Sequence, residues 1–388
     1  MNIINFVNRQ LIYLQFLPKK EDLENNDLIS LSYLLKGKSK KNTLINVLEW
    51  QHNNLQYWID RNVVYTILLI IVFFSIGFLN HFLKAKIPFY VLLIILIIVF
   101  FGDITLDLIY YFVSLFFLLV LMAFILAFNI NYVSLTKDVF LIFVFSSFVL
   151  GSFLSILTYL FVKYKSIKDS IKDFEIADTF KLSLPVEKIL KYRLSICRDY
   201  AKLTAALLLK IYPDDEVYFV LIPQHVALAV KYENKYFVLD QKLPIFRLEK
   251  WLDYWKDKQK RKKMNFSILK LNLEKNLLNL EPIKIELTND VKEMNLNELK
   301  LKLLKSFSLK NLKSDEVKKI KDYYLIKINN VFPYDSEDEL YFESLVEFIK
   351  NKIYEELVGN INNLVYIDIF KNKKNLLIKC YLSKNGNK

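Results

Sequence analysis

The fold is decided by three stretches in the middle of the chain: CRDYAKLTAALLLKIY at 197–212, HVALAVKY at 225–232 and YFVLD at 236–240. The first stretch is rich in Ala and Leu, with apolar residues at helical spacing, so it predicts a helix. The other two are short runs typical of β-strands, as is VYFVLI at 217–222 before them. The sequence therefore predicts a helix followed by antiparallel strands.

Residues that can carry chemistry stand at the ends of these elements. Cys197 begins the helix, where the macrodipole favours the thiolate form of a cysteine. His225 opens one strand and Asp240 closes the next, and a hairpin that turns at residues 233–235 places the two almost opposite each other. Each residue alone is more often structural, but the joint pattern favours a cysteine nucleophile, a histidine acid/base and an orienting carboxylate.

The same region resembles the transglutaminase-like superfamily, which has a papain-like fold. The resemblance covers residues 184–242 and lies in LPVEKILKYRLSICRDYAKLTAALLLK, QHVALAVKY and KYFVLDQK. It implies catalytic roles for Cys197 as nucleophile, His225 as acid/base and Asp240 as orienting residue.

The chain departs from the usual pattern of that family at three positions. Ser195 stands where a glycine is usual, two positions before the cysteine. Tyr236 replaces a frequent tryptophan before the strand that bears the aspartate, and Gln241 replaces a frequent proline after it. These departures bear on the efficiency of catalysis and not on the fold.

An earlier segment carries a second part of the resemblance. TLINVLEWQHNNLQYWIDR, residues 43–61, is similar to the helix that precedes the cysteine segment in archaeal-type, membrane-anchored members of the superfamily. The resemblance implies that the residues between this segment and Cys197 are an insertion that splits the catalytic domain. Such an insertion requires an even number of membrane spans.

Apolar residues are concentrated between residues 63 and 163. The chain is 54% hydrophobic and 24% charged, which indicates a membrane block beside soluble blocks. A membrane-spanning helix needs about 20 apolar residues, and four runs approach or exceed this length. They are Val63 to Phe82, Ile87 to Phe101, Leu108 to Ile130 and Val139 to Val162. Because the runs have almost no polar face, we expect four transmembrane helices rather than buried helices of a soluble protein.

Charges near these runs predict the orientation and the partners. Basic residues outside the block outweigh those in the intervening loops: they are Arg61 before the first run and Lys163, Lys165, Lys168 and Lys172 after the last. We therefore expect a multi-pass protein of the cell membrane, with both termini and the catalytic domain in the cytoplasm. The net charge of +13 fits contact with membrane lipid, and no nucleic-acid partner is expected because no recognition motif is present.

The predicted fold class is α+β. It comprises a four-helix transmembrane block, a transglutaminase-like (papain-like) domain with an antiparallel sheet, and a C-terminal α/β extension. The expected boundaries are 1–62 for an N-terminal soluble segment, 63–163 for the membrane block, 164–255 for the catalytic domain and 256–388 for the Lys-rich extension. Residues 43–61 are assigned by the resemblance to the catalytic domain.

Other elements are expected on either side of the central stretches. Helices are predicted over Val186 to Tyr192, Leu248 to Trp255 and Ser336 to Val358. The second of these runs into a basic cluster and is consistent with contact to an anionic membrane surface or with a solvated helix end. A final hairpin is predicted over residues 364–382, with Cys380 in its core.

The leading interpretation is a membrane-bound cysteine-nucleophile enzyme that acts on amide bonds of a protein or peptide. A protease-like hydrolase and a transglutaminase-like acyltransferase both remain open. The alternative is a non-catalytic peptide-binding module on a membrane anchor, and a transporter is disfavoured because the four runs contain almost no polar residues. No cofactor and no metal is expected, since the chain has only three His and two widely separated Cys.

Overall fold

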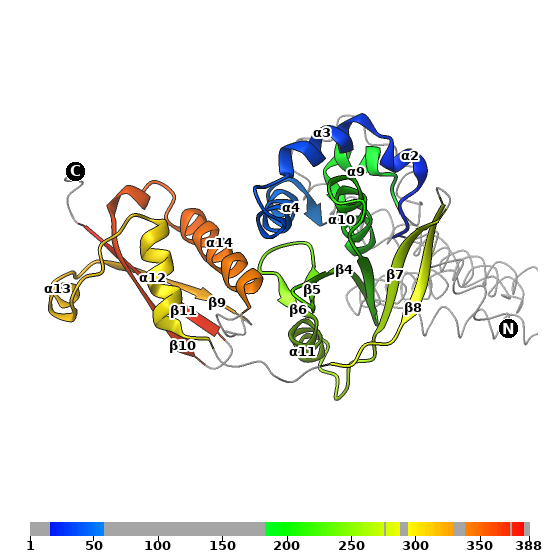
Figure 1. Cartoon of the computed structure of the whole chain (residues 1–388). Helices are drawn as coiled ribbons and strands as arrows, with labels where there is room; N and C mark the ends of the chain where they lie inside the picture. Colours follow the sequence, from blue (N-terminus) through cyan, green and yellow to red (C-terminus); the bar gives the residue numbers. More distant parts are fainter. Residues whose placement is uncertain are drawn as a thin grey trace, which may run out of the picture. The chain divides into compact units, whose positions relative to one another are not determined.

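The computed structural model describes residues 16–57, 183–274, 277–287, 294–329, 338–372 and 375–383 (Figure 1). The chain forms two compact units, of which the first combines Met1–Gln56 with Pro185–Lys388. The second unit, Tyr57–Leu184, lies almost wholly outside the described residues. The elements discussed below belong to the first unit.

A six-stranded antiparallel sheet forms the centre of this unit. Its strands are β3 Val217–Ile222, β4 His225–Tyr232, β5 Lys235–Leu239, β6 Phe246–Arg247, β7 Ser267–Glu274 and β8 Leu277–Ile283. They lie in the order β6-β5-β4-β3-β7-β8. Glu233 and Asn234 both have positive φ, the conformation of the two-residue turn that matches the twist of a hairpin. That turn sets the register that pairs Leu228 with Leu239.

Helices cover both faces of the sheet. Alternate residues of β3 point to opposite faces, so that Val217 and Phe219 pack in the cluster that contains Ala205 of α10, Cys197–Ile211. Tyr218 and Val220 pack in a second cluster, on the other face, that contains residues of α11, Leu248–Lys258. Because both faces are buried, β3 is apolar throughout and shows no polar alternation.

Local chemistry explains where α10 begins. The backbone N–H of Ile196 donates to the Asp199 carboxylate at 3.2 Å, so the side chain of the first turn caps the helix. Alanines and leucines then fill the helix, and it ends at Ile211, two residues before Pro213. Nearly every side chain of α10 is buried, which makes it the central helix of the unit.

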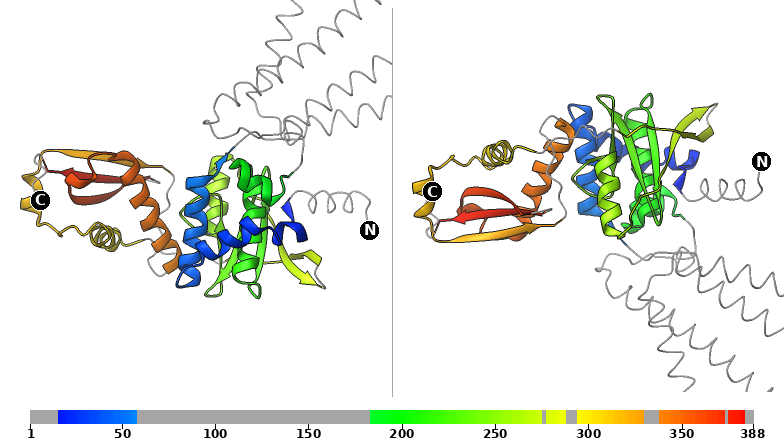
Figure 2. Two further views of the ribbon diagram at one scale, coloured as in Figure 1. Left: turned by 90° about the horizontal axis from the view of Figure 1, so that it is seen from above. Right: turned by 90° about the horizontal axis from the view of Figure 1, so that it is seen from below.

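Three longer helices and the short α2 pack around α10. The longer three are α3 Asn26–Leu35, α4 Lys40–Asn54 and α9 Val186–Tyr192, and Figure 2 shows the blue α3 and α4 beside the green α10. The shorter α2, Lys20–Leu23, places Asp22 so that it accepts from the N–H of Val186 at 2.7 Å and caps α9. Segments from the two sides of the long intervening sequence therefore form one body.

Polar contacts secure α4 to α10. Gln51 Nε2 donates to Thr204 Oγ1 at 2.8 Å, and both residues are buried. The Tyr200 hydroxyl donates to the carbonyl of Leu55 at 3.1 Å. Beside them, the short strands β1 Gln56–Tyr57 and β2 Leu194–Ser195 pair with each other.

The C-terminal part contains a three-stranded sheet in the order β10-β11-β9, with β9 Tyr323–Ile328, β10 Leu364–Asn372 and β11 Asn375–Leu382. Its helices are α12 Leu296–Ser306, α13 Ser314–Lys318 and α14 Glu339–Glu356, with a 3-10 turn at Ile361–Asn363. Cys380 is fully buried in this core, as its place in the predicted strand indicated.

The described elements confirm most of the predicted helices and strands. α9, β3 and β4 have the predicted bounds, and β5 differs by one residue at each end. The hairpin of β7 and β8 was not predicted, and it extends the central sheet to Ile283. Its strands carry Asn272 and Lys270 among the apolar residues, and Pro282 lies in the edge strand β8, where a missing N–H is tolerated.

The structure does not support the predicted four-helix transmembrane block. Within the described residues, no helix is both long and apolar enough to cross a membrane. The longest of them, α14, has 18 residues, but charged side chains recur along it at Glu339, Glu343, Glu347, Lys350, Lys352, Glu355 and Glu356. The four runs assigned as spans, within residues 63–163, lie outside the described residues. The fold class is therefore corrected to α+β with antiparallel sheets, and the predicted multi-pass membrane location is withdrawn with it.

The Gln51–Thr204 contact yields a test of the packing between α4 and α10. Thr204→Val leaves the buried Gln51 amide without its acceptor, so we expect the free energy of unfolding to fall by about 1–3 kcal/mol. Adding Gln51→Leu removes the orphaned amide and should recover part of the loss. Chemical denaturation of the single and double variants measures both effects, and unchanged stability of Thr204→Val would contradict the assigned contact.

Candidate active site

Cys197 is the first residue of α10 and is half-buried. The first amide N–H groups of a helix have no acceptor within the helix, so they place partial positive charge beside the sulfur. The thiol is also hydrogen-bonded to the side chain of His225. Cys197 is thus accessible in part and lies beside both the start of α10 and the imidazole of His225.

His225 is the first residue of β4, and its side chain is 5% exposed. Its Nε2 lies 2.8 Å from Oδ1 of Asp240. Burial lowers the pKa of His225, but the charge and hydrogen bond of Asp240, with a smaller contribution from Cys197, raise it to about 9. The imidazole is therefore held in its protonated form at neutral pH.

Asp240 follows β5 directly and accepts hydrogen bonds at both carboxylate oxygens. Oδ1 faces His225, and Oδ2 accepts from the indole N–H groups of Trp251 at 2.8 Å and Trp255 at 3.2 Å. Burial acts to raise the pKa of Asp240, but His225 and the two indoles outweigh it and lower the pKa. The carboxylate is thus held ionised although it is largely removed from water.

Trp251 and Trp255 lie one turn apart on α11, so both indoles reach the same carboxylate. The Trp255 ring also stacks on the imidazole of His225, with 4.1 Å between ring centroids. The ammonium of Lys258 lies 4.1 Å from the centroid of the same indole. α11 therefore supplies both indole donors to Oδ2 of Asp240 and an aromatic ring that stacks on the imidazole of His225.

Sequence reasoning missed the role of α11. It predicted the helix and its tryptophans, but it interpreted them as a membrane-facing or solvated surface. In the structure Trp251 is 1% exposed and contacts the candidate site. The available signal was the spacing of four between two indoles, which follow Asp240 within 15 residues.

The three departures from the usual family pattern also have defined positions. Ser195 lies in β2, and its Oγ is buried without a hydrogen-bond partner in the described part of the chain. Tyr236 lies in β5 and makes an edge-on ring contact with Tyr218 at 5.2 Å. Gln241 has a φ of 59°, a conformation that proline cannot adopt. The turn after Asp240 is therefore built differently from one that carries proline.

No group of three or more His, Cys, Asp or Glu that could hold a metal occurs among the described residues. The three candidate residues form a chain of neighbours from Cys197 through His225 to Asp240. This arrangement suits transfer of a proton along with nucleophilic attack by sulfur. The expected absence of metals and cofactors from the whole chain stays a prediction.

Comparison with known proteins assigns the fold that holds this site. A family model described as a transglutaminase-like domain matches residues 26–267, which include α3, α4, α10, α11 and all three candidate residues. The chain belongs to this transglutaminase-like family. The family resemblance drawn from the sequence is thereby confirmed, whereas the narrower membrane-anchored, archaeal-type assignment is not established by the match.

A curated relative supports the same region. The chain is 30% identical to the UPF0252 protein MJECL39 of Methanocaldococcus jannaschii over 242 residues. The alignment covers 60% of this chain and 58% of the relative, so the chain spans less than two thirds of that protein's length. No solved structure matches the transglutaminase-like chain significantly.

The two cysteines of the chain should differ in reactivity. Burial raises the pKa of Cys380 to about 12, so its thiolate is scarce at neutral pH, whereas Cys197 has the helix start and His225 as partners. We expect iodoacetamide at pH 7 to modify Cys197 first, and His225→Ala to slow this reaction by about tenfold. Peptide mass mapping over time measures both rates. Equal labelling of the two cysteines would contradict this expectation.

Proposed function

We propose that this chain is a cysteine-nucleophile enzyme that acts on amide bonds of a protein or peptide. The observation that carries the proposal is the imidazole of His225, which lies 2.8 Å from the Asp240 carboxylate and is hydrogen-bonded to the thiol of Cys197. Membership of the transglutaminase-like family supports the same class of chemistry. The roles of the individual residues follow from their positions.

The first half of the reaction forms an acyl-enzyme. The Cys197 thiolate attacks the amide carbonyl carbon and forms a C–S bond, while the carbonyl π electrons move to oxygen. The N–H of Cys197, at the open end of α10, can donate to this oxyanion. As the C–N bond breaks, the imidazolium of His225 gives a proton to the leaving nitrogen. Since Nε2 faces Asp240, Nδ1 is the nitrogen left for this transfer.

The second half releases the acyl group. Water or a primary amine attacks the acyl carbon, the neutral imidazole of His225 takes the proton, and the C–S bond breaks to restore the thiolate. Water gives hydrolysis, and an amine gives a new amide. Both outcomes need the same three residues, so the site is compatible with a protease-like and with a transglutaminase-like reaction.

Asp240 has a positioning and an electrostatic role. Its carboxylate fixes the ring orientation of His225 and stabilises the imidazolium, which gives its proton away in the first half of the reaction and is formed again in the second. The indoles of Trp251 and Trp255 saturate the second oxygen and leave the first one for His225. Asp240 can therefore stay charged through the whole cycle.

Substitution of the three residues tests the proposal. Cys197→Ala should abolish turnover, and Asp240→Asn should lower kcat by about 10²–10⁴-fold because the tautomer and orientation of His225 are disturbed. Cleavage of a dye-labelled casein reports hydrolysis, and incorporation of a fluorescent primary amine into casein reports transfer.

Cys380→Ala is the matched control for these variants and should retain full activity, because Cys380 lies in β11 of the C-terminal sheet and contributes no contact to His225 or Asp240. If Cys197→Ala is as active as the wild type, the proposed function is wrong. If Cys197 of the wild-type protein also resists iodoacetamide, a non-catalytic peptide-binding module takes its place.

The pH dependence offers a second test. His225 acts as an acid only while it is protonated, and its pKa is raised to about 9. We therefore expect kcat/KM to stay high at neutral pH and to fall as the pH rises through about 9. The groups that face the imidazole are Cys197 and Asp240, and Tyr254 and Lys258 act on Asp240 in turn. Constant kcat/KM up to pH 10.5 would contradict the assigned role of His225.

A further inference from the structure

A buried cluster of charges links the C-terminal part of the chain to the segment that follows Asp240. Asp338, the residue before α14, is 4% exposed. Its Oδ1 lies 2.6 Å from Nζ of Lys235, and its Oδ2 lies 3.5 Å from Nη1 of Arg247. Arg247 is equally buried and is the residue that precedes α11. Asp338 therefore contacts the start of the helix that carries Trp251 and Trp255.

A second polar contact holds the loop itself. The N–H of Ile245 donates to Oγ of Ser344 at 2.9 Å, and the same hydroxyl donates to the carbonyl of Tyr341 at 2.7 Å. Ser344 is fully buried. Because both polar groups are removed from water, breaking this contact leaves an unpaired amide in the interior.

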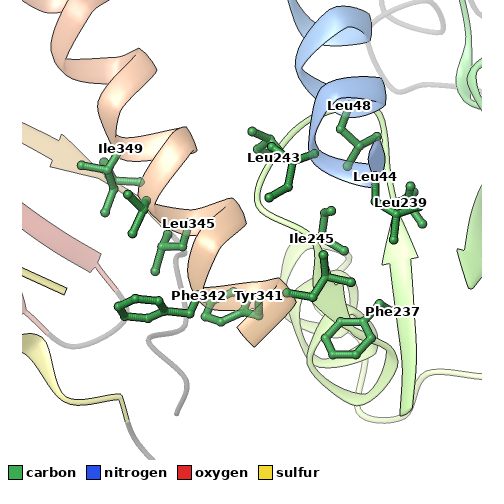
Figure 3. Packing of buried hydrophobic residues seen from close by; sticks show 14 of the residues in the cluster. Leu44, Leu48, Phe237, Leu239, Leu243, Ile245, Tyr341, Phe342, Leu345 and Ile349 are labelled. Atoms are coloured by element: carbon green, nitrogen blue, oxygen red, sulfur yellow. The ribbon is translucent and has the colours of Figure 1, made fainter. Parts of the chain in front are cut away.

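Apolar packing surrounds these two contacts. Leu243 and Ile245 of the loop lie in one cluster with Tyr341 and Leu345 of α14, as Figure 3 shows. The ring of Tyr341 also lies 5.7 Å from the ring of Phe246, in β6. The loop of residues 241–247 is thus fixed by α14 through charge, hydrogen bonding and apolar contact together.

The 241–247 loop connects Asp240 to the helix whose indoles donate to its carboxylate. The carboxylate that binds His225 lies at its beginning, and α11, with both indole donors for that carboxylate, starts at its end. A shift of the loop moves the acceptor relative to its donors. Displacements of about 1 Å in a supporting element can cost about 10²-fold in rate, so the loop needs a rigid backing.

We propose that Asp338 and Ser344 of the C-terminal part are positioning residues for the catalytic site, which act by fixing the 241–247 loop and with it Asp240. This inference rests on the proposed function. It assigns a role to a part of the chain beyond residue 267, where the family match ends. In this role α14 belongs to the framework of the active site, although it contributes no atom to the reaction.

The test compares Asp338 variants with a control on the same helix. Asp338→Ala removes both contacts of the carboxylate, and Asp338→Asn keeps its shape without its charge. Glu347→Gln is the control, because Glu347 pairs with Lys350 of α14 itself. All are made in the Cys380→Ala background, so that Cys197 is the sole thiol of the chain.

Two readouts distinguish a displaced Asp240 from a general loss of folded protein. We expect Asp338→Ala to lower kcat on casein about tenfold with KM little changed, and Asp338→Asn to lie between it and the wild type. The pH midpoint of the basic decline in kcat should fall by about half a unit or more, since a displaced Asp240 stabilises the imidazolium less. Ser344→Ala should also lower kcat, because it leaves the N–H of Ile245 without its acceptor.

Each outcome bears on a defined claim. If Asp338→Asn and Ser344→Ala match Glu347→Gln in kcat and in pH midpoint, the inference is overturned while the proposed function stands. Should Asp338→Ala fail to fold, the other two variants decide. If casein is not turned over by the wild type, the pH dependence of Cys197 alkylation replaces kcat: an unchanged profile in both variants overturns the inference, and a shifted profile supports it.

Discussion

The described site depends on one buried charge pair, His225 with Asp240. A carboxylate and an imidazolium taken out of water are tolerated only if they are paired and their remaining oxygens and nitrogens find partners. The fold meets this demand from three directions: α10 presents Cys197, the β4–β5 hairpin brings the pair to 2.8 Å, and α11 supplies two indole donors. The helices on the two faces of the sheet bury the alternate apolar side chains of β3.

Much of this arrangement could be predicted from the sequence because it is local. The bounds of β4 follow from a continuous apolar run and a turn whose residues accept positive φ. The register that pairs Leu228 with Leu239 then sets Asp240 across from Ala227, so that His225, two residues away on the same face, is its diagonal neighbour. The start of α10 at Cys197 is likewise a local matter of capping by Asp199.

The rest depends on tertiary contacts that no local pattern encodes. The indoles of Trp251 and Trp255 looked like a surface feature until the sheet placed Asp240 beneath them. The β7–β8 hairpin was not predicted, although Lys270 and Asn272 alternate with leucines in β7 as in a strand that is buried on one face. The membrane prediction rested on apolar runs that lie outside the described residues, and within those residues no helix, α14 included, is both long and apolar enough to cross a bilayer.

The contact between Gln51 and Thr204 joins residues 153 positions apart in the sequence. α4 packs against α3, but it also buries Leu44 and Leu48 in the core that α10 completes, so this side of the helix lacks its α10 partner while the ribosome is still translating the intervening residues. Closing so long a loop is a slow step compared with forming a helix. The nascent N-terminal segment is therefore exposed for the whole of that interval, and its assembly has to follow the synthesis of the strands that α10 covers.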